Sequence, residues 1–441
     1  MTLWFDTAWI DGCWTDRVRL RFADGRIASV EHGVDPAASD ERHAIGVPGI
    51  PNVHSHAFQR GMAGLAERRG PGDDDFWSWR ELMYRFVERI TPDDLEAIAA
   101  QAYAEMLESG FTRVGEFHYL HNLPDGTAGT QMAAAIVEAA RVAGIGLTLL
   151  PVFYAQGGFG GAPAGPAQRR FITDIDGYAR LIEQSRDLAS VLPGARVGIA
   201  PHSLRATTLD QLRAILPLAQ DGPVHIHVAE QVKEVEDCLA WSGQRPVEWL
   251  LDKMPVDPDW TLVHATHLVE AERRAMAASG AVAGLCPITE ANLGDGLFPA
   301  PAYLADGGAI AVGSDSNVRI DAAEELRLLE YGQRLSARAR NVLAGEHRPA
   351  TGARLFDAAV RGGRRSLGIA GDRADFVALD PSDPAFVGRR GDALIDSWIF
   401  AARAPVDCVW QQGVKCVAGG RHVARDAIER RFRAALTRLI A

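Results

Sequence analysis

The chain has 441 residues, of which 47% are hydrophobic and 23% charged, so it can bury the core of a large barrel together with a smaller domain. Its formal net charge of −11 argues against a nucleic-acid-binding surface, and an anionic ligand would need arginines placed close to it. The sequence has no apolar run near the ~20 residues that cross a bilayer, no signal-peptide pattern, and five scattered cysteines without a Cys-x-x-Cys pair, which together predict a cytoplasmic protein without a membrane partner.

The first 47 residues are predicted to form short β-strands. Val18–Phe22 and Ile27–Val30 flank Asp24-Gly25, a pair that favours the tight turn of a hairpin. A hairpin of this size cannot bury enough apolar surface to fold alone. We therefore expect the N-terminal strands to complete their sheet with another part of the chain.

Residues 48–370 alternate between strand-like and helical patterns. Helical periodicity is present, for example, in Pro92–Ser109 and Gln131–Ala143. The eight strand-like runs are Ile45–His56, Thr112–Phe117, Gly146–Val152, Ala195–Ala200, Pro223–Val228, Thr261–His264, Gly280–Cys286 and Ala309–Gly313. This alternation predicts an α/β fold with a closed (β/α)₈ barrel of the TIM-like type. A doubly wound open sheet is the competing architecture, but no Gly-rich phosphate loop follows the first run.

The C-terminal part of the chain returns to a β pattern. Asp375–Asp380 is strand-like, and Cys408–Val417 has the pattern of a second hairpin. We expect residues 371–423 to join residues 1–47 in one composite small β domain, a β-sandwich. Residues 424–441 have helical spacing and many arginines, which predicts a C-terminal helix with a solvated face.

Two histidines end the first strand-like run. His54 and His56 are separated by one residue, so in a strand their side chains project from the same face. Imidazole is the commonest metal ligand in proteins, and the pair is a candidate for half of a divalent-metal site. An isolated His-x-His is more often unrelated to a metal. Its meaning depends on further ligands at the ends of other strands.

Further ligands do follow, at the ends of three later runs. His227 lies near the end of the Pro223 run, His264 ends the Thr261 run, and Asp315 follows the Ala309 run. Residues just past the strands of such a barrel gather at one rim, where active sites form. Three histidines and one aspartate suit zinc or a similar divalent ion, and a position left open for water marks a catalytic site.

Four motifs together resemble the amidohydrolase superfamily, and its mononuclear deaminase branch in particular. They are HSHAFQR (54–60), HIHVAE (225–230), VHATHL (263–268) and GSDS (313–316). Three longer stretches are similar to one group of deiminases within this branch: residues 49–67, 200–206 and 286–299. The resemblance covers essentially the whole chain.

The resemblance implies which residues hold the metal and move protons. The implied ligands of one zinc or similar divalent ion per subunit are His54, His56, His227 and Asp315. No lysine stands where dinuclear members keep a bridging carboxylated lysine, so a single ion is expected. Glu230 resembles the acid/base that passes a proton to the substrate nitrogen, His264 the group that positions the attacking water, and Asp315 the acceptor of its proton.

The resemblance also implies the substrate and its contacts. Five residues resemble groups that orient the substrate or hold its carboxylates: Gln59, Arg80, Tyr119, His202 and Arg205. Two arginines suit a substrate with two carboxylates, because a planar guanidinium pairs bidentately with a carboxylate. The expected reaction converts N-formimino-L-glutamate and water to N-formyl-L-glutamate and ammonia, a step of histidine degradation. The family further implies a homodimer, with the Gly157–Gly165 loop and the terminal β segments as candidate contacts.

Several alternatives stay open. Arg60 competes with Arg80 for the substrate, whereas His118, His225 and His267 are more readily explained as structural than as ligands. A related deaminase of a nucleobase or another amidine-like compound would use the same ligands, with an apolar or aromatic slot in place of paired arginines. A barrel that has lost catalysis and serves as a scaffold is a third alternative, and the complete set of reactive residues argues against it.

Overall fold

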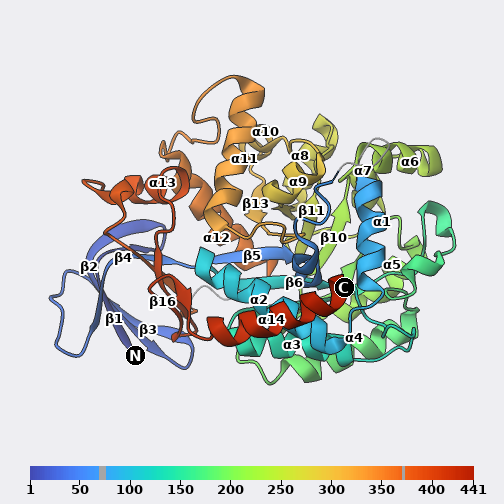
Figure 1. Ribbon diagram of the computed structural model, residues 1–441. Helices are drawn as coiled ribbons and strands as arrows, with labels where there is room; N and C mark the ends of the chain where they lie inside the picture. Colours follow the sequence, from blue (N-terminus) through green and yellow to red (C-terminus); the bar gives the residue numbers. More distant parts are fainter. Residues whose placement is uncertain (69–75, 370–372) are drawn as a thin grey trace.

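The structure is a computed structural model that describes residues 1–68, 76–369 and 373–441 (Figure 1). The predicted boundary between the barrel and the second segment of the small domain, at residues 370/371, lies outside these ranges. All five cysteines are free. Within the described ranges, no helix is long and apolar enough to cross a bilayer.

A ring of parallel strands lies at the centre of the larger part of the molecule (Figure 1). It consists of a five-stranded and a four-stranded sheet, which parallel bridges join at both edges, Ser55 to Asp315 and Ile199 to Val224. The strands are β5 (Ile50–Ser55), β6 (Phe111–His118), β7 (Gly146–Phe153), β8 (Arg196–Val197) with β9 (Ala200–Pro201), β10 (Val224–Val228), β11 (Trp260–His264), β12 (Val282–Leu285) and β13 (Ala309–Val312). The predicted (β/α)₈ barrel is confirmed, with β8 and β9 sharing the fourth position.

The barrel strands are buried on both faces. Every residue of β6, β7, β10 and β11 is buried, polar ones included. Strands covered on one face by the barrel interior and on the other by helices have continuous apolar sequences without alternation. This is why the runs could be recognised in the sequence as strands and why polar residues near their ends stand out.

Helices connect the strands and cover the ring. They begin and end with ordinary signals: α2 has a capping box of Thr91 and Asp94, Pro92 in its first turn, and Gly110 at φ 100° after its last turn. The α-helices of this part are α1 (Phe76–Val87), α2 (Pro92–Ser109), α3 (Gln131–Ala143), α4 (Ile175–Ala189), α5 (Leu209–Ile215), α6 (Val232–Ser242), α7 (Pro246–Lys253), α8 (Glu270–Ser279), α9 (Pro287–Leu293), α10 (Ala300–Ala305), α11 (Ala322–Ala337) and α12 (Thr351–Ser366). Short 3₁₀ turns are η1 (Ala57–Met62), η2 (Phe159–Gly161), η3 (Pro166–Gln168), η4 (Leu216–Ala219) and, nearer the C-terminus, η5 (Pro384–Phe386).

Strands from both ends of the chain form one eight-stranded mixed sheet, in the order β17-β16-β15-β14-β4-β1-β2-β3. The two segments meet where β4 (Glu41–Pro48) pairs antiparallel with β14 (Phe376–Leu379). The sheet curls over, so that Leu20, Phe376 and Trp410 share one buried core in the predicted β-sandwich. The other elements here are β1 (Thr2–Ile10), β2 (Cys13–Ala23), β3 (Arg26–Glu31), α13 (Asp392–Phe400), β15 (Val406–Gln411), β16 (Val414–Ala418) and β17 (Arg421–His422).

The apolar run that begins at Ile45 is divided between the two parts of the molecule. β4 ends at Pro48 in the curled sheet, and β5 begins at Ile50 in the barrel. Gly49 joins them, and a Cβ atom there would lie only 2.1 Å from the Cγ2 atom of Thr112. The expectation of a single barrel strand was therefore wrong for the first half of the run, because an unbroken apolar pattern does not show where the chain changes sheets.

The C-terminal helix α14 (Arg425–Ile440) packs along α2 (Figure 1). Arg431 Nη1 lies 2.5 Å from Glu96 Oε1, and Arg438 pairs with Asp94. The prediction of a helix is confirmed. Its arginines, however, do not form a purely solvated face, since several bind carboxylates of α2 that helical spacing alone cannot identify.

Candidate active site

Three histidines and an aspartate from different barrel strands converge on one point. His54 and His56 lie at the end of β5, His227 lies in β10, and Asp315 follows β13. The Nε2 atom of His54 is 3.2 Å from that of His56 and 2.9 Å from that of His227. Asp315 Oδ1 lies 3.5 Å from His54 Nε2 and 3.3 Å from His56 Nε2. The structure thus brings the four predicted ligands together, with one atom from each within 4.8 Å of the others.

The chemistry of this donor set fits a divalent cation. His56 Nδ1 is 2.9 Å from the carbonyl oxygen of Phe117, and His227 Nδ1 is 3.0 Å from that of His202, so the proton of each ring is assigned to Nδ1 and the lone pair to Nε2. Burial lowers the pKa of His56 to about 3 and holds the pKa of His54 and of His227 well below its usual value. Neutral imidazole lone pairs that face one another beside a carboxylate repel unless a cation lies between them.

A buried hydrogen-bond network, which we call the clasp, joins the first and last barrel strands behind the ligands and consists of Asn52, Ser55, Ser314 and Asn317. Asn52 Nδ2 donates to Ser314 Oγ at 2.7 Å, and Asn52 Oδ1 accepts from the Ser314 backbone N–H at 3.1 Å. Ser314 Oγ donates to Asn317 Oδ1 at 2.6 Å, and Asn317 Nδ2 donates to Ser55 Oγ at 3.1 Å. The clasp closes the barrel where the ligands of β5 meet Asp315.

Three strand ends at the barrel mouth have left-handed backbone conformations. The φ angle is 51° at Ala229, 65° at His264 and 45° at Asp315. For a residue with a Cβ atom this conformation costs on the order of 1 kcal/mol, and it persists where the surrounding structure holds it. In this barrel it turns the chain sharply after each strand and directs the neighbouring functional side chains into the mouth.

His264 lies among three carboxylates. Its Nε2 atom is 3.8 Å from Glu230 Oε1 and 3.7 Å from Asp315 Oδ2, and its Nδ1 atom is 3.2 Å from Glu290 Oε1. Burial alone would lower the pKa of His264, but the carboxylates, Glu230 first, raise it to about 10. Burial raises the pKa of Asp315 to about 7, although His264 acts in the opposite direction. His264 therefore lies within 4 Å of both other predicted catalytic residues, Glu230 and Asp315.

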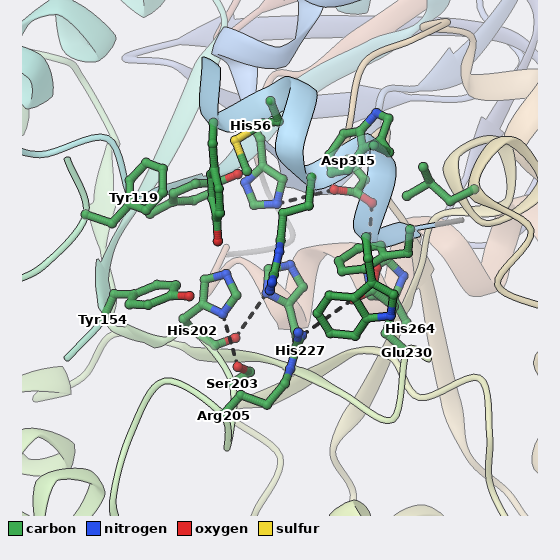
Figure 2. Close-up of a pocket in the computed structure, with 18 of the residues that line it drawn as sticks. His56, Tyr119, Tyr154, His202, Ser203, Arg205, His227, Glu230, His264 and Asp315 are labelled. Carbon is green, nitrogen blue, oxygen red and sulfur yellow. Dashed lines mark hydrogen bonds and ion pairs between the residues drawn. The ribbon is translucent and has the colours of Figure 1, made fainter. Parts of the chain in front are cut away.

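A cavity of about 330 Å³ opens beside these groups (Figure 2). Its wall contains all five residues predicted to contact the substrate: Gln59, Arg80, Tyr119, His202 and Arg205. Figure 2 shows Tyr119, His202 and Arg205 around the same hollow as His227 and Asp315. A concave site of this size, with a few convergent polar groups, suits a small molecule.

Two arginines of the wall contact the ring of Trp77. The guanidinium carbon of Arg80 lies 4.4 Å from the ring centroid, and that of Arg205 lies 5.8 Å from it. The Nε atoms of both arginines are buried and have no hydrogen-bond partner within the described part of the chain. A buried donor without an acceptor costs about 1–3 kcal/mol, so this side of the cavity favours a ligand with carboxylate oxygens.

The other predicted substrate contacts are held by neighbours in the wall. Gln59 Nε2 donates to Tyr119 Oη at 2.9 Å, and Gln59 Oε1 has no partner among the described residues. His202 Nδ1 lies 3.1 Å from Ser203 Oγ. Burial and the charge of Arg205 hold the pKa of His202 well below its usual value, so a neutral imidazole faces the cavity. Each of these groups can donate to or accept from a polar ligand.

The residues that competed for these roles lie elsewhere. Arg60 Nε binds Glu105 Oε2 at 2.6 Å, and its Nη1 atom donates to two backbone carbonyls, so Arg80 and not Arg60 faces the cavity. Three histidines expected to be structural are absent from the described wall of the cavity: His118, His225 and His267. His225 Nε2 instead lies 2.8 Å from the carbonyl oxygen of Ser366.

Sequence reasoning missed some residues of the site. Tyr154 directly follows β7 and lines the cavity, so the rule that selected the other strand ends would have found it. Trp77 precedes Arg80 by one helical turn, which makes it a neighbour on the same face of α1. Glu290 follows the seventh strand-like run, where the same rule places it at the rim, but no local signal marks it as the partner of His264. Nor does one mark Glu234 as a buried neighbour of Arg205, because both contacts join different elements.

Two family models match the chain. Residues 45–416 match the model of the amidohydrolase family, and residues 6–44 match that of the N-terminal domain of formimidoylglutamate deiminase HutF. The first match contains all the residues of the candidate active site named above. The second falls on the N-terminal strands of the curled sheet.

The chain is also similar to individual proteins. It is 48% identical to formimidoylglutamate deiminase of Pseudomonas aeruginosa over 431 residues, which cover 95% of each chain. A crystal structure of an amidohydrolase from Brucella melitensis is 55% identical, with a TM-score of 0.97 and 100% of both chains covered. An adenosine deaminase from Xanthomonas campestris with bound zinc is 22% identical, with a TM-score of 0.80 over 99% of this chain and 98% of that one, which is a likeness of fold alone.

Proposed function

The chain belongs to the amidohydrolase family, and we propose from this membership and from the site that it is a formimidoylglutamate deiminase. The reaction takes N-formimino-L-glutamate and water to N-formyl-L-glutamate and ammonia. The oxygen of water bonds to the formimino carbon, the bond from that carbon to the terminal nitrogen breaks, and this nitrogen leaves as ammonia after taking up the protons of water. The step belongs to histidine degradation.

We assign one zinc or similar divalent ion to the site. The residues that would hold it are His54, His56, His227 and Asp315, whose ligand atoms converge. Such an ion lowers the pKa of water towards about 7 and so supplies hydroxide at neutral pH. The zinc bound by the adenosine deaminase of Xanthomonas campestris supports the choice of ion.

Asp315 and Glu230 transfer protons in the proposed reaction, and His264 positions the attacking water. Asp315 accepts a proton from the attacking water, and His264, 3.7 Å from Asp315 Oδ2, orients the water by hydrogen bonding. Glu230 Oε1 lies 3.8 Å from His264 Nε2 and delivers a proton to the leaving nitrogen. This delivery is needed because an amide anion is a very poor leaving group, whereas ammonia is a good one.

The remaining wall residues bind the substrate. Arg80 and Arg205, with Tyr119, take the two carboxylates, which satisfies the buried Nε atoms of both arginines. Gln59 and His202 orient the formimino end towards the reactive groups. Placing both ends of the substrate holds the formimino carbon near the water, and such positioning is itself a large part of catalysis.

The observation that carries this proposal is the presence, in one cavity, of a hydrolytic donor set and two arginines whose buried Nε atoms have no acceptor among the described residues. The test is to incubate the purified, zinc-loaded protein with N-formimino-L-glutamate and to measure ammonia and N-formyl-L-glutamate together. We expect equal amounts of both products. Ammonia no higher than in a reaction without protein would contradict the assignment.

A nucleobase deaminase is the second candidate, and one observation favours it. Seven aromatic side chains besides Tyr119 line the described cavity: Phe76, Trp77, Trp79, Tyr84, Tyr154, Phe159 and Phe171. Replacing Arg205 with alanine separates the candidates. If the dicarboxylate is the substrate, its kcat/KM should fall about 100-fold, because a buried charge partner is lost. The exposed Arg274, changed to alanine, is the matched control and should have no effect. A variant R205A that deaminates a nucleobase as fast as the unchanged protein would favour the second candidate.

We also propose that the enzyme is a cytoplasmic homodimer. The support is the family resemblance, and the Gly157–Gly165 loop is a candidate contact whose Gly157, Gly158 and Phe159 line the cavity. Sedimentation equilibrium of the zinc-loaded protein should give twice the mass of one chain. A monomer at micromolar concentration would remove this part of the proposal.

A further inference from the structure

Glu234 is a buried carboxylate that the proposed reaction does not use. It lies in the first turn of α6, its side chain is fully buried, and it is not part of the described cavity wall. We propose that Glu234 is a positioning residue that holds both Glu230 and Arg205, so that proton transfer and carboxylate binding depend on one side chain. This inference rests on the proposed function.

One role of Glu234 is to hold the turn that carries Glu230. Glu234 Oε1 accepts a hydrogen bond from the backbone N–H of Ala229 at 3.2 Å, and Oε2 accepts one from that of Glu230 at 3.2 Å. Ala229 has a φ angle of 51°, which is unfavourable for alanine, and these two bonds stabilise it. Without them the turn can relax, and the Glu230 carboxylate, 3.8 Å from His264, moves with it.

The other role of Glu234 is to balance the charge of Arg205. Oε2 of Glu234 and Oε2 of Glu230 each lie 3.9 Å from Arg205 Nη2. At this distance the attraction holds the guanidinium in place, but it is too long for a hydrogen bond, so the N–H donors stay free for a ligand. Burial disfavours the charged form of Arg205, yet the two carboxylates, Glu234 first, raise its pKa.

The two carboxylates near Arg205, those of Glu230 and Glu234, have different roles in the proposed reaction. Glu230 changes its charge during each turnover because it takes up and releases a proton. Glu234 does not line the described cavity, so it takes no part in the proposed proton transfer; burial, and also the charge of Glu230, raise its pKa, whereas Arg205 lowers it. Arg205 therefore keeps a second carboxylate neighbour when Glu230 takes up a proton.

The test compares two glutamate-to-glutamine substitutions on α6 in the zinc-loaded full chain. Glu234→Gln keeps the shape of the side chain but removes its charge. It also replaces one carboxylate oxygen with an amide nitrogen, which cannot accept a hydrogen bond from the backbone. The control is Glu236→Gln, at an exposed position of the same helix. For N-formimino-L-glutamate we expect E234Q to lower kcat about 10-fold and to raise KM about 10-fold, whereas E236Q changes neither by more than about 2-fold.

A second substrate separates positioning of Arg205 from a general disturbance. With N-propylformamidine, which has no carboxylate, the kcat/KM of E234Q should fall only about 10-fold, since only the effect on Glu230 remains. Glu234→Asp keeps the charge but withdraws it from the turn, so it should lower kcat while KM rises by less than about 3-fold. This variant also keeps the test decisive if E234Q does not fold.

Three results would overturn the inference: E234Q kinetics within about 2-fold of the unchanged protein, an equal loss of kcat/KM for both substrates, or loss of zinc from both Glu234 variants. The last would assign Glu234 a role in the fold alone. If the unchanged protein releases no ammonia from N-formimino-L-glutamate, the proposed function is wrong. If the unchanged protein is active but E234Q and E236Q have equal kinetics, only the inference about Glu234 is wrong.

Discussion

Of the three groups of metal-ligand-type side chains among the described residues, two share no residue and lie in different parts of the molecule. One is at the barrel mouth and contains His54, His56, His227 and Asp315; the other is in the curled sheet and contains His43, Asp407 and Cys408. At the barrel mouth the side chains of His54, His56 and Asp315 are 0%, 5% and 7% exposed, whereas in the sheet those of His43 and Asp407 are 11% and 35% exposed. Both clusters gather suitable atoms within 4.8 Å.

The clusters differ in how their polar atoms are satisfied. In the sheet, His43 Nε2 lies 3.0 Å from Glu41 Oε1, Cys408 Sγ lies 3.5 Å from Asp407 Oδ2, and Lys415 pairs with Glu41. Burial raises the pKa of the Cys408 thiol to about 11, which disfavours the thiolate that binds metals. At the barrel mouth, by contrast, the lone pairs face one another. Suitable residue types at short distances are therefore not enough to indicate a metal site. The stronger indication is a set of acceptor atoms that converge with no hydrogen-bond donor among them.

The same chemical change can be made in both clusters, and Asp315→Asn should have the largest effect. It keeps the shape of the side chain but removes the negative charge of a proposed ligand, which is also the proposed proton acceptor for water. We expect ammonia release to fall more than about 1000-fold, equivalent to about 4 kcal/mol of transition-state stabilisation, together with weaker zinc binding. The measurements are kcat/KM and zinc competition against a chromophoric chelator. Activity within tenfold of the unchanged enzyme would refute the role given to Asp315.

Asn317→Ala tests the clasp behind the barrel-mouth cluster and should have an intermediate effect. It removes the acceptor of Ser314 Oγ and the donor to both Ser55 Oγ and the backbone carbonyl of Asp315, while every proposed ligand side chain stays in place. Loss of groups that orient ligands lowers metal affinity about 10- to 100-fold in other sites, and unsatisfied buried groups cost about 1–3 kcal/mol of stability. Zinc competition and thermal unfolding report the two effects. A lower Tm with unchanged zinc affinity would show that the clasp serves the fold only.

Asp407→Asn, the same substitution in the curled sheet, should have the smallest effect. Its carboxylate is partly exposed, and interactions of such groups contribute about 0–1 kcal/mol. We expect unchanged zinc stoichiometry and kcat/KM, with a free energy of unfolding within about 1 kcal/mol of the unchanged protein. A zinc equivalent lost with D407N would mean that the cluster with satisfied partners also binds metal, and the comparison would no longer hold.

Much of the barrel could be predicted because its signals are local. Buried parallel strands are continuous apolar runs, and ligands at their ends stand out as polar residues, as His54 and His56 do. Because these signals are local, they do not show where the chain changes sheets. The run that begins at Ile45 was therefore predicted as one strand, although it crosses from the curled sheet into the barrel. The same limit applies to the account of α14, whose arginines bind carboxylates of α2 that are distant in the sequence.

The sequence by itself determined which residues could do the chemistry. Alternating strands and helices bring their polar ends to one rim, so candidate ligands could be chosen by type and position, whereas the exact ligand set and the role of Glu230 were implied by the family resemblance. Only the tertiary structure decided between Arg80 and Arg60, and it revealed Glu290 beside His264 and Glu234 between Glu230 and Arg205. The physical reason is range: backbone periodicity is set by neighbours along the chain, whereas a hydrogen bond or ion pair depends on distances of a few ångströms between elements that the sequence separates.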